Sequence, residues 1–400
     1  MGLQKLLSPA SINQLPLKNR IIKAATFEGM IREEDISDDC IRLHTRLAQN
    51  QVALTTLAYC ATEADGRLEE THFYIRESVQ PTLVKLADSV HRAGGKLSGQ
   101  LTHCGGFTKN KKLIRVRPVA PSYSLNTMGA MQGLLFNQKM DKQLMQEIID
   151  SFRNAALLMK HSGFDAIEIH FGHGYLLSQF ISPLTNKRSD EFGGTLSNRM
   201  RFPLMVLDAV RSAVGIHFPI LGKITMYDDM QNGICLNDSI EAAALLEKNG
   251  IDAIILSAGT SSQNSMLLFH GDSILPGLLK YEKNPALRFF MQAFKHKYFR
   301  DYPYKELYLL EAAKKFREKI RTNLVYIGGA TEAGSLEKIM NEGFDFVQLG
   351  RPLIRDPKMV SHLMQFGERY KNGCTHCNQC APLMNDPGGI RCVLPDWKRD

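Results

Sequence analysis

The sequence predicts an α/β protein folded as one closed (β/α)8 TIM barrel, and three observations support this prediction. First, three segments share a pattern in which a helix ends in Gly, Asp follows, and an apolar run begins: HSGFDAIEIH, KNGIDAIILS and NEGFDFVQLG. Second, the chain contains eight apolar, β-rich runs, the number that closes a parallel barrel. Third, no G-x-G-x-x-G follows the first run, which disfavours the alternative of a doubly wound open sheet.

The predicted strands and helices alternate along the chain. Strands are expected over residues 20–27, 51–59, 95–101, 165–170, 218–225, 252–257, 324–327 and 345–349, as in sheets buried on both faces. Amphipathic helical patterns lie between them, at 82–93, 142–160, 198–214, 239–248 and 336–341. Gly163, Gly250 and Gly343 follow three of the helices and are expected to take the left-handed conformation that ends a helix.

Two segments do not belong to the bare barrel. Residues 261–322 separate the sixth and seventh strands and are rich in aromatic and basic residues, so we expect an insertion with extra helices over the barrel mouth. Residues 372–400 hold four of the eight cysteines and form an extension. We therefore expect one barrel domain over 1–371, although a prior of ~150 residues per domain would divide the chain into two or three.

The composition is that of an ordinary soluble protein, with 44% hydrophobic and 22% charged residues. No stretch approaches the ~18 apolar residues of a membrane span, and the opening MGLQKLLSPASINQLPLKN lacks the apolar region of a secretory signal. We expect a cytoplasmic location and no membrane partner. The net charge of +8 suits anionic cofactors or nucleic acid, but no RNA-binding domain is visible, so we expect no nucleic-acid partner. A homo-oligomer stays open.

The end of the fourth predicted strand carries the strongest candidate chemistry. His170 and His173 lie there, and Tyr175 follows. Active sites of such barrels form at the carboxyl ends of the strands, where two imidazoles and a phenol could polarise an oxygen and supply a proton. The alternative is a pair of structural histidines. A zinc site is disfavoured because no third ligand is evident nearby.

Other strand ends add candidate cofactor contacts. Gln100, after the third strand, offers an amide to the edge of a heterocycle. Lys223, in the fifth, is either a snorkelling lysine or a counter-charge for an anionic ring. The loops after the last two strands most often bind phosphate in this fold; they contain Gly328, Gly329, Gly350 and Arg351.

The fourth-strand block, EIHFGHGYLLSQFISPLTNKRSDEFGGTLSNRMRF, resembles the signature of Old Yellow Enzyme-type NADH:flavin oxidoreductases. The resemblance runs from Leu6 to about Pro357 and includes SPASINQLPLKNRIIKAATF, the ADGR of residues 64–67, GQLTHCGG and LGRPLIRDP. It implies a barrel that holds FMN noncovalently and takes electrons from NAD(P)H. It also implies that flavin N5 passes hydride to the β-carbon of an activated alkene, the small-molecule substrate of an ene-reductase.

The resemblance assigns roles to individual residues. His170 and His173 match the pair that binds the substrate's carbonyl or nitro oxygen, and Tyr175 matches the proton donor. The implied cofactor contacts are Gln100 and Lys223 on the flavin ring, Gly329, Gly350 and Arg351 on the phosphate, and Ala25, Thr26 and Tyr59 along the isoalloxazine, largely through backbone.

The chain departs from the family's pattern at three places. Lys223 stands where an arginine is usual, so a point charge replaces a planar fork. Phe27 stands where the family often has Thr or Cys near the flavin O4. Cys104, Gly105 and Gly106 replace a frequent Ala-Gly-Arg, which removes one basic contact. The departures at Lys223 and Phe27 bear on redox potential and rate more than on FMN binding.

The cysteine extension is the second specific signal. Cys374, Cys377, Cys380 and Cys392 are spaced much like the ligands of a cubane cluster. They resemble the 4Fe–4S motif of the multidomain dienoyl-CoA reductases and of amine dehydrogenases such as trimethylamine dehydrogenase, where the cluster exchanges electrons with a partner. A structural zinc, with His376 as a spare ligand, and thiols without a metal are the alternatives.

Three other functions remain as alternatives to alkene reduction. One is an amine dehydrogenase- or dienoyl-CoA reductase-like enzyme that passes electrons to a redox partner protein through the cluster. Another is an RNA-modifying flavoprotein of the dihydrouridine synthase kind, and a third is a non-catalytic flavin or metal carrier. The basic run TKNKKLIRVRP at residues 108–118 either attracts an anionic ligand or is a solvated loop.

Overall fold

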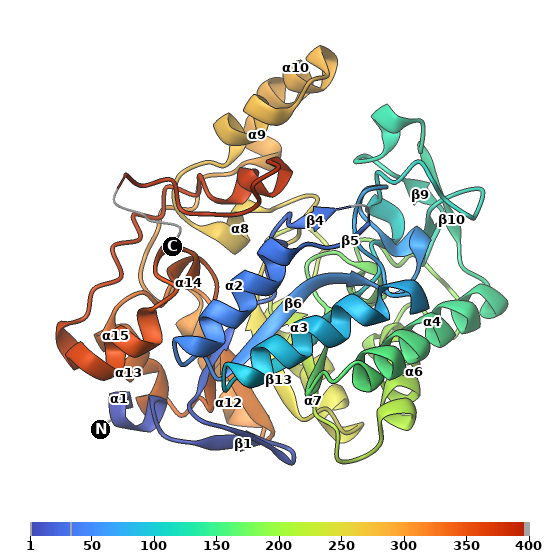
Figure 1. Cartoon of the computed structure of the whole chain (residues 1–400). Coiled ribbons are helices and arrows are strands. Elements are labelled where there is room, and N and C mark those ends of the chain that lie inside the picture. Colours follow the sequence, from blue (N-terminus) through green and yellow to red (C-terminus); the bar gives the residue numbers. More distant parts are fainter. Residues whose placement is uncertain (1, 33, 396–400) are drawn as a thin grey trace.

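The computed structural model, which describes residues 2–32 and 34–395, is a closed barrel of eight parallel strands surrounded by helices (Figure 1). The strands occur in the order β11-β12-β13-β14-β15-β3-β6-β7 around the barrel, so consecutive units are neighbours. Their bounds are β3 Ile21–Lys23, β6 Leu54–Ala61, β7 Lys96–Thr102, β11 Ala166–Phe171, β12 Ile220–Thr225, β13 Ala253–Ser257, β14 Asn323–Tyr326 and β15 Phe346–Leu349. The predicted fold class and all eight strands are confirmed.

The first strand is shorter than predicted. Strand β3 ends at Lys23, whereas the apolar run continues to Phe27. The ladder ends after Ala24, whose amide still donates to Leu349. The chain then turns, because the Glu28 carboxylate pairs with Lys23 and accepts a hydrogen bond from Thr26 at 2.8 Å. Hydrophobicity alone could not reveal this ion pair.

Helices cover the outer face of the barrel. They are α2 Asp38–Gln49, α3 Gln80–Arg92, α4 Lys142–His161, α6 Leu196–Val214, α7 Leu236–Lys248, α12 Leu310–Lys319, α13 Ala333–Asn341 and α15 Met359–Phe366, with the short α5 Leu176–Ile181 and α14 Arg351–Arg355 after the fourth and eighth strands. The five predicted helices are present. Gly163, Gly250 and Gly343 have φ of 89°, 84° and 88°, the left-handed conformation predicted for them.

The barrel interior has an apolar floor. Ile22, Leu54, Ala166, Leu221, Ile255, Val325 and Phe346 point inward and pack with Ile12, Leu15 and Leu17 of the N-terminal hairpin. This hairpin, β1 Ala10–Ile12 and β2 Leu15–Leu17, follows α1 Gly2–Leu6 and closes the end of the barrel opposite the mouth. Because side chains alternate along a strand, residues two positions further on form the next interior layer, nearer the mouth.

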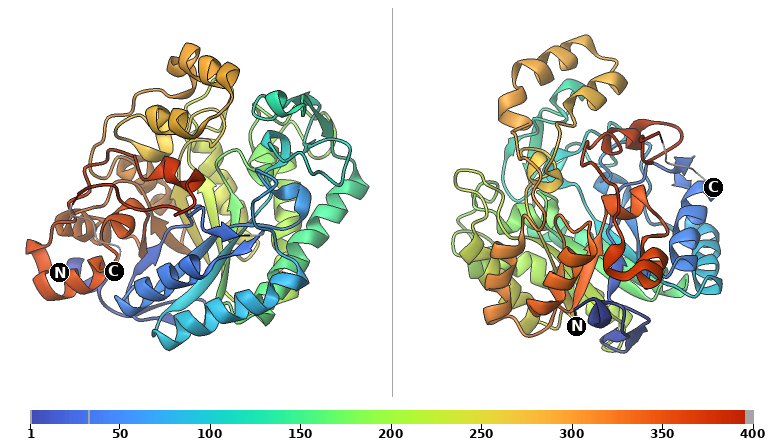
Figure 2. Two further views of the ribbon diagram at one scale, coloured as in Figure 1. Left: turned by 45° about the horizontal axis from the view of Figure 1, so that its top comes forward. Right: turned by 90° about the vertical axis from the view of Figure 1, so that its left-hand side faces the viewer.

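Two additions stand at the mouth end (Figure 2). After β7, residues 108–139 contain a small sheet, β8 Val119–Ala120, β9 Ser124–Leu125 and β10 Phe136–Lys139, in the order β8-β10-β9. After β13 come α8 Met266–Phe269, α9 Leu275–Tyr281, α10 Pro285–Ala293 and α11 Lys295–Tyr298. A short hairpin, β4 Ile31–Arg32 with β5 Asp35–Ile36, follows the first strand. None of the described helices is both long and apolar enough to cross a bilayer.

Candidate active site

His170, His173 and Tyr175 lie together at the mouth, as predicted. The rings of His170 and His173 have centroids 4.9 Å apart and stand nearly perpendicular. The Tyr175 ring lies 4.5 Å from that of His170 and 5.3 Å from that of Tyr59. All four side chains are therefore within reach of a single small molecule.

The local chain geometry explains this grouping. His170 is near the end of β11, and the chain then turns sharply through His173 at φ 56° and Gly174 at φ 78°. The His173 amide donates to Thr225 Oγ1 at 2.7 Å, and its ring Nε2 lies 2.7 Å from Ser257 Oγ. The turn places Tyr175 at the N-terminus of α5. Because Thr225 and Ser257 belong to the fifth and sixth strands, these two strands fix the position of the His173 ring.

Burial sets the protonation of these groups. It lowers the pKa of His170 well below its usual value, with His173 and Lys223 adding repulsion, and it lowers that of His173 to about 3, aided by Lys223. Both imidazoles are therefore neutral near pH 7. Burial raises the pKa of Tyr175 well above 10, and the neighbouring Tyr59 and Cys104 raise it further. The site thus offers neutral nitrogen donors and a phenol that keeps its proton.

A polar layer lies directly below. Glu168, two residues before His170, is fully buried and accepts hydrogen bonds from Gln100 Nε2 at 2.6 Å and Gln348 Nε2 at 2.9 Å. The Lys223 ammonium lies 2.9 Å from the same carboxylate. Lys223 therefore points into the barrel, and the snorkelling alternative is wrong. Sequence reasoning missed Glu168 and Gln348, although their two-residue spacing from inward-facing neighbours indicated them.

The glycine loops have the backbone that close approach to a ligand requires. Gly328 and Gly329 have φ of 126° and 69°. A Cβ on Gly350 would meet only Thr26 and Ala24, at 3.6 and 3.8 Å, so one side of this glycine is open. The Arg351 guanidinium donates to the His270 carbonyl at 2.8 Å and to Asn378. Arg351 is thus held by two loops beside the predicted phosphate site.

These residues fit FMN. Gln100 Oε1, Gln348 Oε1 and His170 Nε2 are buried and have no hydrogen-bond partner among the described residues, which is costly unless a ligand supplies one. Gly350 leaves space that a side chain would fill. Phe27 stacks on Tyr59 at 5.8 Å and lies 4.4 Å from His72, beside Ala25 and Thr26 in the coil after β3. Residues predicted as site contacts thus come from five strand ends, those of β3, β6, β7, β11 and β15.

The predicted metal ligands of the extension come near one another. The thiols of Cys374 and Cys380 are raised in pKa by burial, and both interact electrostatically with Cys377 and Cys392. No three of these sulfurs, among the described residues, lie within 4.8 Å of one another, whereas a Zn–S distance of ~2.3 Å requires sulfurs about 4 Å apart. His376, the spare ligand, stacks on Tyr304. The arrangement therefore does not match a preformed zinc site.

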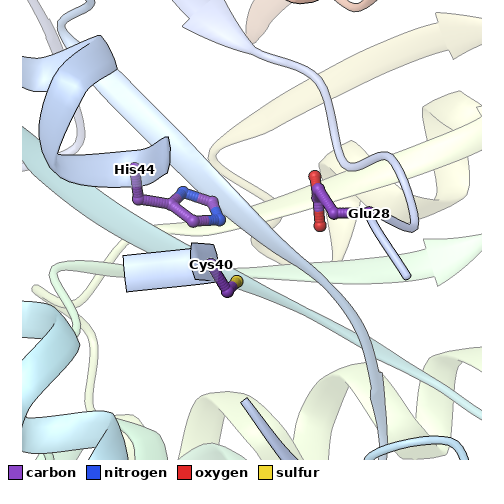
Figure 3. Close-up of side chains that lie close together, drawn as sticks. All are labelled: Glu28, Cys40 and His44. Carbon is purple, nitrogen blue, oxygen red and sulfur yellow. The ribbon is translucent and has the colours of Figure 1, made fainter. Parts of the chain in front are cut away.

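A second cluster, not predicted, lies between α2 and the first strand (Figure 3). The ligand atoms of Glu28, Cys40 and His44 lie within 4.8 Å of one another, and His44 Nε2 has no partner in the described part of the chain. However, the Lys23 ammonium is ion-paired with Glu28 and donates to Thr56. It already provides the positive charge that this buried carboxylate needs, and a divalent ion would add uncompensated charge. We assign no metal to it.

A cavity of 720 Å3 lies beside this cluster, and Thr26 and Gly350 are among its lining residues. Most of its wall comes from α2, α14 and residues 390–391, on the outer side of the barrel. Neither His170 nor Tyr175 lines it. It is therefore separate from the space between the histidine pair and Tyr175.

The basic run at residues 108–118 is partly neutralised. Arg115 pairs with Glu63, Asp65 and Glu147, and Lys109 pairs with Glu69. These acids come from the loop after β6 and from α4, and sequence reasoning did not identify them. Lys111, Lys112 and Arg117 are exposed.

Fold and site together define the barrel of an oxidoreductase, with a polar interior layer, a histidine pair and a phenol at its mouth, where a heterocyclic cofactor would be held. The chain belongs to the NADH:flavin oxidoreductase / NADH oxidase family, whose sequence model matches residues 5–263. It is an FMN-dependent NAD(P)H oxidoreductase, and the resemblance to Old Yellow Enzyme-type flavoenzymes is confirmed.

Among curated proteins, the chain is 35% identical over 395 residues to a 4,4'-dithiodibutanoate disulfide reductase of Rhodococcus erythropolis, covering 98% of this chain and 95% of that one. It is 27% identical over 360 residues to an NADPH dehydrogenase of Bacillus subtilis, covering 88% and 92%. It is 28% identical over 379 residues to an NADH oxidase of Thermoanaerobacter brockii, covering 93% of this chain but 52% of that protein.

Among solved structures, a 2-naphthoyl-CoA reductase superposes with a TM-score of 0.81 at 22% identity, covering 98% of this chain and 56% of that one. An old yellow enzyme homologue from Zymomonas mobilis superposes with a TM-score of 0.70 at 20% identity, covering 93% and 96%. The chain thus spans about half the length of the first structure and nearly all of the second. At these identities the likeness shows the fold alone.

Proposed function

We propose that this enzyme reduces activated C=C bonds, of enones or enoates, by adding hydride to the β-carbon and a proton to the α-carbon. The observation that carries the proposal is the pairing of a buried, unsatisfied His170 Nε2 with a protonated Tyr175 whose ring centroid lies 4.5 Å away. When bound, FMN supplies the hydride that it received from NAD(P)H. Gln100, Lys223, Ala25, Thr26, Phe27, Tyr59, Gly328, Gly329, Gly350 and Arg351 would hold it.

The protein's own groups do the rest. His170 and His173, both neutral, donate hydrogen bonds to the substrate's carbonyl oxygen and withdraw electron density from the alkene. Tyr175 holds its proton until negative charge develops at the α-carbon. Ser257 keeps His173 in place through its 2.7 Å contact with Nε2. Burial of the whole group excludes water, which would otherwise weaken these contacts.

Disulfide reduction is a second candidate, and the 35% identity to the dithiodibutanoate disulfide reductase over nearly the whole chain supports it. Hydride attack on one sulfur breaks the S–S bond, and the leaving thiolate takes a proton, so that one disulfide gives two thiols. The same residues suit this reaction, since the histidine pair can donate to the thiolate and Tyr175 can protonate it.

One experiment tests both candidates. The anaerobic, FMN-loaded enzyme is reduced with NADPH or NADH and then mixed in separate runs with cyclohexenone and with 4,4'-dithiodibutanoate. Reoxidation of the flavin by the enone, with saturated ketone as product, is the expected result. Reoxidation by the disulfide alone would replace the first proposal with the second. A purified protein that is colourless and does not quench added FMN fluorescence would exclude both.

We propose that the four extension cysteines hold a 4Fe–4S cluster that exchanges electrons with a redox partner protein. Their spacing along the chain supports this, and the interactions of Cys374 and Cys380 with Cys377 and Cys392 place the four thiols near one another, as the ligands of one cluster must be. Iron and sulfide analysis of anaerobically purified protein should give four of each per chain. Zinc in place of iron, or neither metal, would refute it. A cytoplasmic, reducing compartment would suit such a cluster.

A further inference from the structure

Exposed apolar side chains gather in two segments of the molecule. Residues 108–139, which follow β7, are called the first arm, and residues 275–300, which contain α9, α10 and α11, the second arm. Ten of the sixteen exposed large hydrophobic residues in the described chain lie in these arms, a concentration that marks an interaction surface. They are Ile114, Val116, Tyr123, Leu125, Met131, Leu135 and Phe136 in the first arm, and Phe289, Phe290 and Phe294 in the second.

The second arm presents an ordered apolar stripe. None of the nine residues of α10 is buried, and Phe289 is 73% exposed. The ring centroids of Phe290 and Phe294 lie 4.6 Å apart, and Tyr298 continues the row at 6.0 Å from Phe290. Spacings of four residues place these rings on one side of the helical segment. Phe290 and Phe294 are 40% and 47% exposed, and Tyr298 is half-buried.

Both arms are strongly basic. Together they contain twelve Lys and Arg residues and one acid, Glu282, a net charge of +11, whereas the whole chain carries +8. The rest of the protein is therefore net −3, although four cations of the arms are ion-paired with acids outside them: Lys109, Arg115, Lys139 and Arg300. Lys111, Lys112, Lys283, Lys295 and Lys297 are exposed close to the apolar side chains.

The two arms flank the barrel mouth. Each follows the carboxyl end of a strand, β7 or β13, so both rise from the end of the barrel that carries the active site. Figures 1 and 2 show them standing apart on either side of this end, with α10 projecting furthest. A flat partner can touch both projections at once, whereas a compact partner would have to bridge the gap between them.

We propose that the two arms dock the mouth of the barrel onto an anionic lipid surface. Exposed aromatic and aliphatic side chains flanked by lysines are what an interfacial segment needs, because the apolar groups enter the headgroup region while the cations attract its phosphates. This departs from our expectation of no membrane partner, which rested on the absence of a spanning segment. Docking would leave the chain outside the bilayer.

Two other occupants fit less well. A second copy meeting these arms with its own would bring together the exposed lysines of both copies, which repel. A single-stranded nucleic acid would use the basic charge and the aromatic rings, but Ile114, Val116, Leu125 and Leu135 offer no flat face for a base to stack on. The aliphatic share of the surface therefore favours lipid.

The test is co-sedimentation of the FMN-loaded, full-length protein with vesicles. We expect binding to vesicles of phosphatidylcholine with phosphatidylglycerol, about tenfold weaker binding to phosphatidylcholine alone, and a loss of binding at high salt. The triple variant Phe289→Ser/Phe290→Ser/Phe294→Ser should weaken binding by at least about tenfold. The variant Lys111→Glu/Lys112→Glu, which changes only the first arm, should also weaken vesicle binding.

The matched control is Met364→Ser/Phe366→Ser on α15, which removes two comparably exposed apolar side chains that the arms do not contain. It should bind vesicles like the wild type. Equal loss in this control, absence of vesicle binding, a dimer that the Phe variant dissolves, or tighter binding to transfer RNA than to vesicles would each overturn the proposal. NAD(P)H oxidation with a soluble enone should be the same in all variants, so a failure of docking stays distinct from a failure of the proposed function.

Discussion

The ammonium group of Lys223 lies 2.9 Å from the Glu168 carboxylate, and both side chains are buried inside the barrel. Burial lowers the pKa of Lys223, while Glu168 opposes that shift. Gln100 and Gln348 donate to the same carboxylate. Glu168 thus fixes three side chains from three other strands, β7, β12 and β15, just below the mouth, and the position of the Lys223 cation depends on it.

We predict that Glu168→Gln destabilises the protein by about 3–5 kcal/mol, because it leaves a buried ammonium without a counter-charge. The double variant Glu168→Leu/Lys223→Met removes both charges, so its free energy of unfolding should fall by less than that of Glu168→Gln. Urea unfolding of the three proteins at pH 7 measures the difference. A double variant as unstable as the single one would show that packing, not charge pairing, determines the stability of this layer.

A second prediction concerns the proton donor. Tyr175→Phe should slow alkene reduction by about a hundredfold or more, since the α-carbon then lacks its acid. Flavin reduction by NAD(P)H needs no proton from Tyr175 and should be nearly unchanged. Stopped-flow measurement of both half-reactions separates these effects. Tyr370→Phe, which removes a phenol bonded to Asp356 outside the mouth, serves as the control. Equal slowing of both half-reactions would contradict the proposed role.

The sequence predicted the barrel because each strand buries both faces, so hydrophobicity alone marks it. It also placed the histidine pair and Tyr175 correctly, since their position after a strand determines where they lie. Two of the features that it missed depend on contacts between distant segments: the Glu168 layer and the acids that neutralise Arg115. The third, the Lys23–Glu28 pair, is local, but an apolar pattern does not reveal it.

The small sheet of residues 119–139 was missed for a different reason. Its strands are two to four residues long, too short to show a period, and β8 pairs with β10 across a loop. Within residues 261–322, α12 packs against α7 as the regular helix of its barrel unit, so the extra material before β14 is mainly α8 to α11. Local composition could not separate these two parts.

Stability should fall on mild acidification. Burial lowers the pKa of His44 and His170 well below 6.5 and that of His173 to about 3, so the unfolded chain binds protons at these residues that the folded chain does not. The three neutral histidines therefore stabilise the folded state fully above about pH 6.5. This stabilisation is lost as pH falls toward 3, by roughly 1.4 kcal/mol per pH unit for each histidine. Glu28, whose pKa burial raises, acts in the opposite direction.

Urea unfolding at pH 7, 6 and 5 tests this expectation. His44→Gln removes one titrating group, so the free energy of unfolding of this variant should fall less steeply below pH 6.5 than that of the wild type. The two slopes should differ by about 1.4 kcal/mol per pH unit. His161→Gln, at the exposed end of α4, should keep the wild-type slope. Identical slopes in all three proteins would mean that His44 does not titrate differently on folding.

Arg351 joins the last barrel strand to the cysteine extension through its bond to Asn378, which lies between Cys377 and Cys380. Arg351→Met should both detach the extension from the barrel and weaken FMN binding. Asn378→Gly should free only the extension, and glycine tolerates the φ of 56° at this position. Limited trypsin digestion and FMN titration measure the two effects. Weakened FMN binding in Asn378→Gly would show that the extension itself helps to hold the cofactor.

The glycine loops give the sharpest test of where the cofactor lies. Gly350→Ala should change the free energy of unfolding of the apoprotein by less than ~0.5 kcal/mol, because the new Cβ meets no protein atom closer than 3.6 Å. Gly329→Ala should cost about 1–3 kcal/mol, because its φ is 69° and its Cβ would lie 2.7 Å from Tyr308. If the open side of Gly350 receives the FMN phosphate, Gly350→Ala must weaken FMN binding without lowering apoprotein stability. Fluorescence titration with FMN and with riboflavin decides the point, because only FMN carries the phosphate and only its affinity should fall. An equal loss for both ligands would place the phosphate elsewhere.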